Sequence, residues 1–189
     1  IITDIDETIL DNSAYEVHQT LQGKDYEAQS WFEYSSMAVS DTVPGVASFL
    51  KYAASKGITI FYVTNLEERE RKGTLTNLQK YNLPNVDDAH FFPKQNSSSK
   101  EDRRLMVAKT HDVILFLGDN LADFSSMFDK KPMDERLQNT NAIASEFGNR
   151  FIIIPNPVYG DWESSLYKFN YGLSAAQKDS VIKTIFKYY

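Results

Sequence analysis

Short runs of apolar residues recur along the chain, and stretches with helical spacing lie between them. The runs are rich in Ile, Val and Phe and hold few polar residues, as do strands that are buried on both faces of a parallel sheet. They span residues 1–5, 58–63, 89–92, 113–117 and 151–154. This repeated order of strand and helix predicts an α/β domain with a doubly wound parallel sheet.

The spacing of apolar residues also predicts the helices. Val46, Phe49, Leu50 and Ala53 recur at i, i+3, i+4 and i+7. Gly57 follows them, and a glycine commonly ends a helix. Further helices are predicted over 75–81, 100–109, 120–128, 134–147 and 174–188.

Residues 12–42 break this rhythm, because they are polar and aromatic, with Trp31 and Tyr34 among clustered rings. We interpret them as a small helical cap inserted after the first strand. Residues 157–189 are predicted to be a C-terminal extension, and residues 1–189 together a single domain. The aromatic residues of the extension can pack on their own domain or on a second copy, so a homodimer is one option.

Charge and composition exclude several classes of protein. Lys and Arg number 20 against 26 Asp and Glu, for a net charge of −6. Nucleic-acid-binding surfaces are basic, so no nucleic-acid partner is expected. The absence of cysteine excludes disulfides, thiolate metal sites and Cys nucleophiles. The chain starts at Ile1, inside an apolar run, so we expect a processed or truncated product.

Polar side chains follow three of the predicted strands. They are Asp4 and Asp6 after the first run, Thr64 and Asn65 after the second, and Asp119 and Asp123 after the fourth. Ligands of doubly wound sheets bind at the carboxyl ends of the strands. The sequence therefore predicts that these side chains meet in one site.

Four carboxylates in a small volume repel one another and need a cation. Oxygen ligands without His or Cys favour a hard ion, and an open site that meets phosphate favours Mg²⁺. Phosphoryl transfer through an aspartyl-phosphate fits this set: one Asp attacks phosphorus, and a carboxylate two residues on protonates the leaving oxygen. Thr64 can donate to the phosphate. Lys100, or alternatively Lys94, would complete the phosphate cradle.

At this point the motifs resemble a known family. They are DIDET at 4–8, LDNSAY at 10–15, FYVTN at 61–65, GDNLADF at 118–124 and the segment 155–163. They are similar to those of the haloacid dehalogenase-like hydrolases and, within these, of the class C (lipoprotein-type, DDDD) bacterial acid phosphatases. The resemblance implies a Rossmann-like core and a phosphomonoesterase of small substrates such as nucleoside monophosphates. It also implies a bacterial periplasmic or cell-surface location, reached through a leader or lipid anchor that this chain does not include.

The resemblance implies a role for each residue by its position. Asp4 is similar to the nucleophile and metal ligand, and Asp6 to the general acid and base that binds metal through its backbone carbonyl. Asp119 resembles a direct Mg²⁺ ligand, and Asp123 a carboxylate that holds a metal-bound water. The remaining positions are Thr64 and Asn65 for phosphate, Lys100 for the active-site lysine, and Trp31 and Tyr159 for the rings that clamp a base in the relatives that are 5′-nucleotidases.

Two other functions fit the same motifs. One is a DxDxT-type phosphoprotein phosphatase, against which the aromatic insertion argues, since it suits a small ring. The other is a non-catalytic surface binding or storage protein on the same fold. Loss of catalysis usually replaces the nucleophile, and Asp4 is present.

Overall fold

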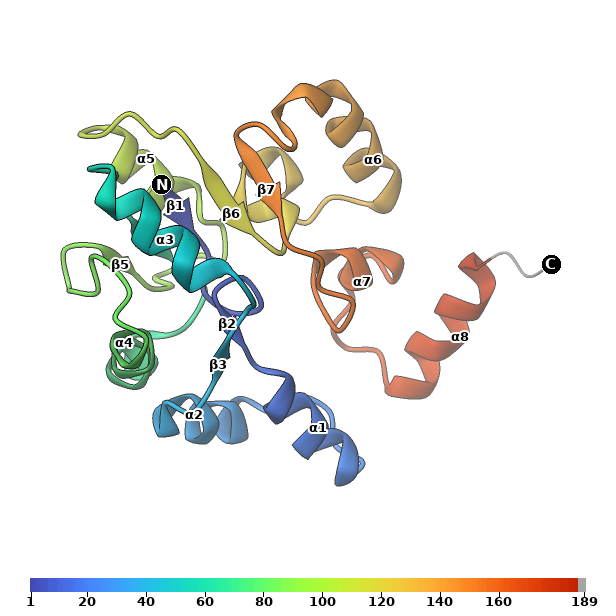
Figure 1. Cartoon of the computed structure of the whole chain (residues 1–189). Helices are drawn as coiled ribbons and strands as arrows, with labels where there is room; N and C mark the ends of the chain where they lie inside the picture. The colour runs from blue at the N-terminus through green and yellow to red at the C-terminus, as the bar shows by residue number, and fades with distance from the viewer. Residues whose placement is uncertain (187–189) are drawn as a thin grey trace.

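A computed structural model describes residues 1–186, and its centre is a parallel sheet of five strands in the order β5-β4-β1-β6-β7 (Figure 1). The strands are β1 (Ile2–Thr3), β4 (Phe61–Val63), β5 (Phe91–Phe92), β6 (Phe116–Gly118) and β7 (Phe151–Ile153). β1 lies in the middle, where Ile2 is in register with Phe61 on one side and Phe116 on the other. The predicted parallel α/β fold is confirmed.

The helices follow the strands in the predicted order. They are α1 (Ser13–Leu21), α2 (Ala28–Met37), α3 (Val46–Ser55), α4 (Arg71–Lys80), α5 (Glu101–Ala108), α6 (Met133–Ala142), α7 (Asp161–Leu166) and α8 (Ala175–Ile185). In the part of the chain that the structure describes, no helix has the length and apolar composition needed to cross a membrane.

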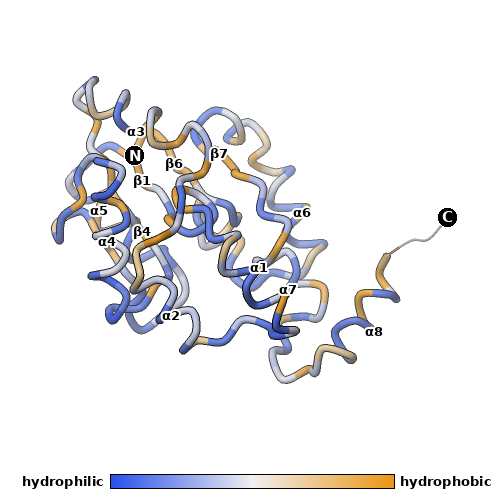
Figure 2. The backbone as a smooth tube through the Cα atoms, turned by 60° about the horizontal axis from the view of Figure 1, so that its bottom comes forward, coloured by the Kyte–Doolittle hydropathy of each residue, from blue (hydrophilic) through white to orange (hydrophobic). Residues whose placement is uncertain are grey.

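Alternating side chains of the strands pack on opposite faces of the sheet, as the pleat requires. On one face, Tyr62 and Leu117 pack with Leu50 of α3 and Leu78 of α4. The other face carries a second cluster, formed by Ile2, Phe61, Val63 and, from α5, Val107. Figure 2 shows hydrophobic colour along the strands at the centre and hydrophilic colour along much of α6.

Residues 12–42 leave the sheet and return to it. β2 (Leu10–Asp11) and β3 (Asp41–Thr42) form an antiparallel pair, and α1 and α2 lie beyond this pair (Figure 1). α2 packs against α4, where Gly73 is needed: a Cβ there would lie 2.4 Å from the carbonyl oxygen of Ser35. The cap assignment stays a prediction, and this packing fixes the segment to the core.

Two predicted helices are broken into shorter pieces in the structure. The stretch 120–128 forms two short 3₁₀ turns, η2 (Leu121–Asp123) and η3 (Ser126–Phe128), because Asn120 and Ser125 each cap a new turn. The stretch 134–147 is α6 followed by a separate turn, η4 (Ala144–Glu146). The last predicted helix is α8, and its expected end at 187–188 lies outside the described residues.

Candidate active site

The carboxyl ends of β1, β4 and β6 deliver polar side chains to one edge of the sheet. Asp4 follows β1, and its backbone N–H donates to the carbonyl of Leu117 over 3.0 Å. Thr64 follows β4, and its N–H donates to the carbonyl of Phe92 over 3.1 Å. Asp119 follows β6 directly. Strand pairing therefore fixes the backbone from which each of these side chains leaves.

Lys100 lies between two of the predicted carboxylates. Its Nζ is 2.6 Å from Oδ1 of Asp4 and 2.6 Å from Oδ1 of Asp123. Lys100 is 4% exposed. Burial alone would lower its pKa, but the carboxylates of Asp123 and Asp4 raise it above the ordinary value. Of the two lysines considered, the structure thus brings Lys100 to the cluster; Lys94 binds the carbonyl of Leu66 through its backbone N–H.

Asp4, Asp119 and Asp123 form a group that suits a cation. One carboxylate oxygen from each lies within 4.8 Å of the others. Burial and the charge of Asp4 raise the pKa of Asp119 to about 8. Burial also raises the pKa of Asp123 to about 6, although Lys100 opposes the shift. Carboxylates so crowded ionise fully only beside a cation, and their hard oxygens fit a divalent ion.

The turn after β6 fixes Asp123 close to the backbone. Its Oδ2 accepts from the N–H of Asn120 over 2.9 Å, which closes a capping box around η2. Gly118 leaves the space for this side chain, since a Cβ there would lie 2.4 Å from both Cβ and Oδ2 of Asp123. The guanidinium of Arg104, which lies on α5, donates to the backbone carbonyls of Ala122 and Asp123.

Asp119 is oriented by two side chains from other segments. Nδ2 of Asn156, which follows β7, donates to its Oδ2 over 2.8 Å. The hydroxyl of Thr8 lies 3.5 Å from its Oδ1. A ligand carboxylate held by such hydrogen bonds keeps one orientation toward a metal.

Asp6 lies outside the group of three carboxylates and belongs to a second network. Its Oδ1 accepts from Nδ2 of Asn12 over 2.9 Å. Burial, with the charges of Asp4 and Glu7, raises the pKa of Asp6 well above its ordinary value. Glu7, which has a left-handed backbone (φ 54°), accepts from the N–H of Asn12 and from the hydroxyl of Tyr159. Asp6 is therefore set up to carry a proton.

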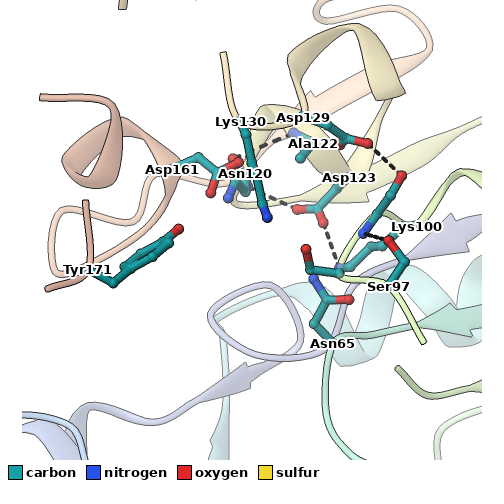
Figure 3. Close-up of a pocket in the computed structure, with 12 residues that line it drawn as sticks. Asn65, Ser97, Lys100, Asn120, Ala122, Asp123, Asp129, Lys130, Asp161 and Tyr171 are labelled. Atoms are coloured by element: carbon teal, nitrogen blue, oxygen red, sulfur yellow. Dashed lines mark hydrogen bonds and ion pairs between the residues drawn. The ribbon is translucent and has the colours of Figure 1, made fainter. Parts of the chain in front are cut away.

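The predicted phosphate residues differ in exposure. Thr64 is fully buried, and its hydroxyl oxygen accepts from the N–H of Leu66 over 3.1 Å. Asn65 is exposed at the mouth of a cavity of about 350 Å³, which Lys100 and Asp123 also line (Figure 3). The cavity continues to Lys130 and Tyr171. It is large enough for a phosphate ester beside the carboxylate group.

The two predicted ring-binding residues occupy different surroundings. Trp31 is 9% exposed and packs edge-on against Tyr15, with ring centroids 5.0 Å apart, and at a tilt against Tyr34. Tyr159 is partly buried, and its hydroxyl donates to Glu7, one residue after Asp6. The geometry places Tyr159 beside Glu7, in the segment that follows β1, and Trp31 within the aromatic cluster of residues 12–42. A base clamp formed by both stays a prediction.

Several residues of the site were not singled out from the sequence. Asn156 follows a predicted strand, so the rule that located the aspartates could have found it. Asn12 lies inside a quoted motif, but nothing in the spacing shows that it binds Asp6. Arg103 and Arg104 lie one turn after Lys100, and both are buried. The surrounding sequence is highly charged and is typical of an exposed helix, so it does not indicate that these two arginines are buried.

Comparison with known proteins identifies the family of this chain. The family model described as "HAD superfamily, subfamily IIIB (Acid phosphatase)" matches residues 1–162. The chain is similar to the class C acid phosphatase from Bacillus anthracis, solved with tungstate bound, at 38% identity and a TM-score of 0.96, over 100% of this chain and 79% of that one. A further structure of that class C enzyme matches with the same values. The resemblance stated from the sequence is confirmed, and the chain belongs to subfamily IIIB of the HAD superfamily as an acid phosphatase, a phosphoric monoester hydrolase.

Proposed function

We propose that this acid phosphatase hydrolyses small phosphate monoesters with Mg²⁺, through an aspartyl-phosphate formed on Asp4. The observation that carries the proposal is the position of Lys100, whose Nζ is 2.6 Å from both Asp4 and Asp123, while Asp119 completes the carboxylate group. A turn cap or a solvated acidic patch would not bury a lysine between two carboxylates. The arrangement suits an anion that arrives next to a carboxylate nucleophile.

Asp4 is the proposed nucleophile because it leaves the central strand at the point where the other groups converge. One of its oxygens binds Lys100, and the second oxygen is left for attack on phosphorus. The buried ammonium also offsets the charge of the incoming phosphate. Thr64, Asn65 and Lys100 would then hold the phosphate oxygens.

Asp6 is the proposed general acid because its environment favours the protonated form. The raised pKa means that the folded protein keeps a proton on Asp6 well above the pH at which a free Asp ionises. Asn12 holds one of its oxygens over 2.9 Å, which fixes the direction of the other. A protonated carboxyl next to the nucleophile can donate to the leaving oxygen.

The reaction then has two balanced steps. An oxygen of Asp4 forms a bond to phosphorus while the ester P–O bond breaks, and the proton of Asp6 passes to the leaving alcohol. A water molecule next attacks the phosphorus of the aspartyl-phosphate and gives a proton to Asp6, while the bond between phosphorus and the oxygen of Asp4 breaks. Inorganic phosphate leaves, and both carboxyl groups return to their starting states.

Asp4, Asp119 and Asp123, with the carbonyl of Asp6, are the residues that would hold the divalent ion. When bound, Mg²⁺ would supply positive charge that lowers the repulsion between the nucleophile and the phosphate. The protein prepares the site by orienting Asp119 through Asn156. The Bacillus anthracis relative was solved with tungstate, a tetrahedral oxyanion similar in shape to phosphate, which supports an oxyanion site here.

A nucleoside monophosphate is the proposed substrate class. Tyr159 lies beside the catalytic segment, and aromatic rings accept many bases because every base has a π face. A phosphoprotein phosphatase would instead need room for a peptide on both sides of the phosphoamino acid. Relative rates on nucleotides and phosphopeptides decide between the two.

The test is phosphate release from a panel of nucleotides, aryl phosphates and phosphopeptides, between pH 5 and 7.5, with Mg²⁺ and with EDTA. Asp4→Asn is the matched variant, because it keeps the shape of the side chain and removes the nucleophilic charge. We expect Mg²⁺-dependent release that Asp4→Asn abolishes, with nucleotides ahead of phosphopeptides. Turnover that Asp4→Asn or EDTA leaves unchanged would overturn the proposal.

A further inference from the structure

Arg103 is a buried cation close to the proposed phosphate site. It lies on α5, three residues after Lys100, and is 3% exposed. Its guanidinium reaches away from solvent toward the segment that follows β4. One nitrogen donates to the carbonyl of Thr64, and the other donates to Oδ1 of Asn65 over 2.8 Å and to the carbonyl of Ser99 over 3.0 Å.

These contacts join the two segments that carry the phosphate-binding groups. Thr64 and Asn65 leave the end of β4, and Ser99 directly precedes Lys100. Asn65, Ser99 and Lys100 line the same cavity (Figure 3). The guanidinium of Arg103 therefore lies behind the wall of this cavity and holds two parts of it together.

The hydrogen-bond partners of Arg103 are all neutral, which sets it apart from its neighbours. Lys100 pairs with Asp4 and Asp123, and Arg104 pairs with Glu101. Within residues 1–186, Arg103 donates only to carbonyl and amide oxygens and forms no ion pair. Of three buried cations within five residues, only this one lacks a carboxylate in contact.

A buried charge without a contacting counter-charge is costly, and such groups are usually paired. Burial lowers the pKa of Arg103, and the more distant charges of Asp4 and Asp123 offset this in part. Its two terminal nitrogens donate four hydrogen bonds, to the carbonyls of Thr64, Phe92 and Ser99 and to Oδ1 of Asn65, and these neutral oxygens do not neutralise its charge. The phosphate that the cavity accepts would bring negative charge to the other side of Asn65 and Ser99.

We propose that Arg103 is a positioning residue of the phosphate site, which holds Asn65 and Ser99 in place and directs its uncompensated positive charge at the bound phosphate. The inference rests on the proposed function, because it takes the cavity beside Lys100 as the phosphate site. Arg103 acts through its neighbours and does not touch the substrate.

Two substitutions separate the charge from a purely structural role. Arg103→Lys keeps the positive charge but loses the planar set of N–H donors of the guanidinium. Arg103→Gln keeps an N–H donor but loses the charge. Arg150→Gln is the control, since it removes one positive charge from an exposed residue that pairs with Glu146 and does not line this cavity. The readouts are the inhibition constant of inorganic phosphate, and kcat and KM for p-nitrophenyl phosphate, all with Mg²⁺.

We expect Arg103→Gln to raise the inhibition constant of phosphate and the KM by about tenfold. Arg103→Lys recovers most of this loss, and Arg150→Gln changes neither value. Wild-type phosphate affinity in Arg103→Gln would overturn the inference, as would equal losses in the Lys and Gln variants. If Arg103→Gln does not fold by circular dichroism, Arg103→Met replaces it; unfolding of both neutral variants would show a structural role and also overturn the inference.

The proposed function is judged separately in these experiments. Wild-type turnover with Mg²⁺, and its loss in Asp4→Asn, test the reaction itself. A normal result there combined with unchanged phosphate affinity in Arg103→Gln would reject the role of Arg103 and leave the reaction standing.

Discussion

Replacing Gly118 with alanine should displace Asp123 and weaken catalysis without removing any polar group. The new Cβ would lie 2.4 Å from Cβ and Oδ2 of Asp123, whereas an ordinary contact begins at 3.4 Å. The neighbour must therefore move by about 1.0 Å, the difference between these two distances. Its Cβ is tied to the backbone, so rotation of the carboxylate alone does not relieve the clash.

This movement acts on the contact between Asp123 and Lys100. At 2.6 Å it is a short, charge-assisted hydrogen bond. Lengthening by about 1 Å removes it, and hydrogen bonds to charged groups contribute about 1.5–3 kcal/mol. That range corresponds to a loss of about ten- to a hundred-fold in kcat/KM, in line with the effect of a misplacement of about 1 Å in an active site.

The assay is kcat/KM for p-nitrophenyl phosphate across a Mg²⁺ titration, with circular dichroism to show that the variant is folded. Gly172→Ala is the control, because a Cβ there meets only Oδ1 of Asn170, at 3.4 Å. We expect Gly118→Ala to lose activity and to need more Mg²⁺, and Gly172→Ala to match the wild type. A folded Gly118→Ala with wild-type kcat/KM and Mg²⁺ dependence would refute the reasoning.

Three further predictions follow from other contacts. Asn156→Ala removes the donor that orients Asp119, so the apparent affinity for Mg²⁺ in activity titrations should fall about tenfold or more; an unchanged affinity contradicts this role. Without metal, Asp119 binds its proton more tightly when folded (pKa about 8, against 3.8 ordinarily), so the free energy of unfolding in EDTA should fall as the pH rises from about 4 to 8, and Asp119→Asn should flatten this slope; urea unfolding at several pH values measures both. Gly73→Ala should lower the free energy of unfolding by about 1–3 kcal/mol, because its Cβ clashes with the carbonyl of Ser35 in α2; an unchanged urea midpoint would contradict the close packing of α2 on α4.

Much of the fold was predictable because the central strands β1 and β4 are buried on both faces. Runs such as 58–63 and 151–154 are apolar at every position except Thr59, and the structure places a strand within each. The ends of the strands were less predictable, since hydrogen bonding to neighbouring strands determines them. The run at 113–117, for example, forms a strand only from Phe116 onward, where β1 and β7 pair with it.

The turns after β6 show where the sequence pattern was insufficient. Residues 120–128 have helical spacing. The side chains of Asn120 and Ser125, however, each accept a hydrogen bond from the backbone of the next turn, so two short 3₁₀ turns form in place of one helix. Such local competition between side chain and backbone leaves little trace in hydrophobic periodicity. The first of these turns nevertheless brings the side chain of Asp123 into close contact with Gly118.

The candidate site was predictable as far as it follows strand ends. Asp4, Thr64 and Asp119 each come directly after a strand, and the structure brings them to one edge of the sheet. The residues that hold them come from elsewhere: Asn156 from the segment after β7, and Arg103 from the buried side of α5. Their roles depend on contacts between distant segments, which one sequence alone does not reveal.

The most direct test of the central claim is to trap the phosphoryl group on the protein. Asp6→Asn removes the base that the second step needs. The first step does not need Asp6 when the substrate is p-nitrophenyl phosphate, because p-nitrophenolate can leave without a proton. With this substrate and Mg²⁺, the variant should therefore accumulate the aspartyl-phosphate. Mass spectrometry after an acid quench should find one phosphoryl group, on the peptide that contains Asp4, and none in Asp4→Asn. Hydrolysis by Asp4→Asn at the wild-type rate, or a phosphoryl group on another residue, would contradict the account.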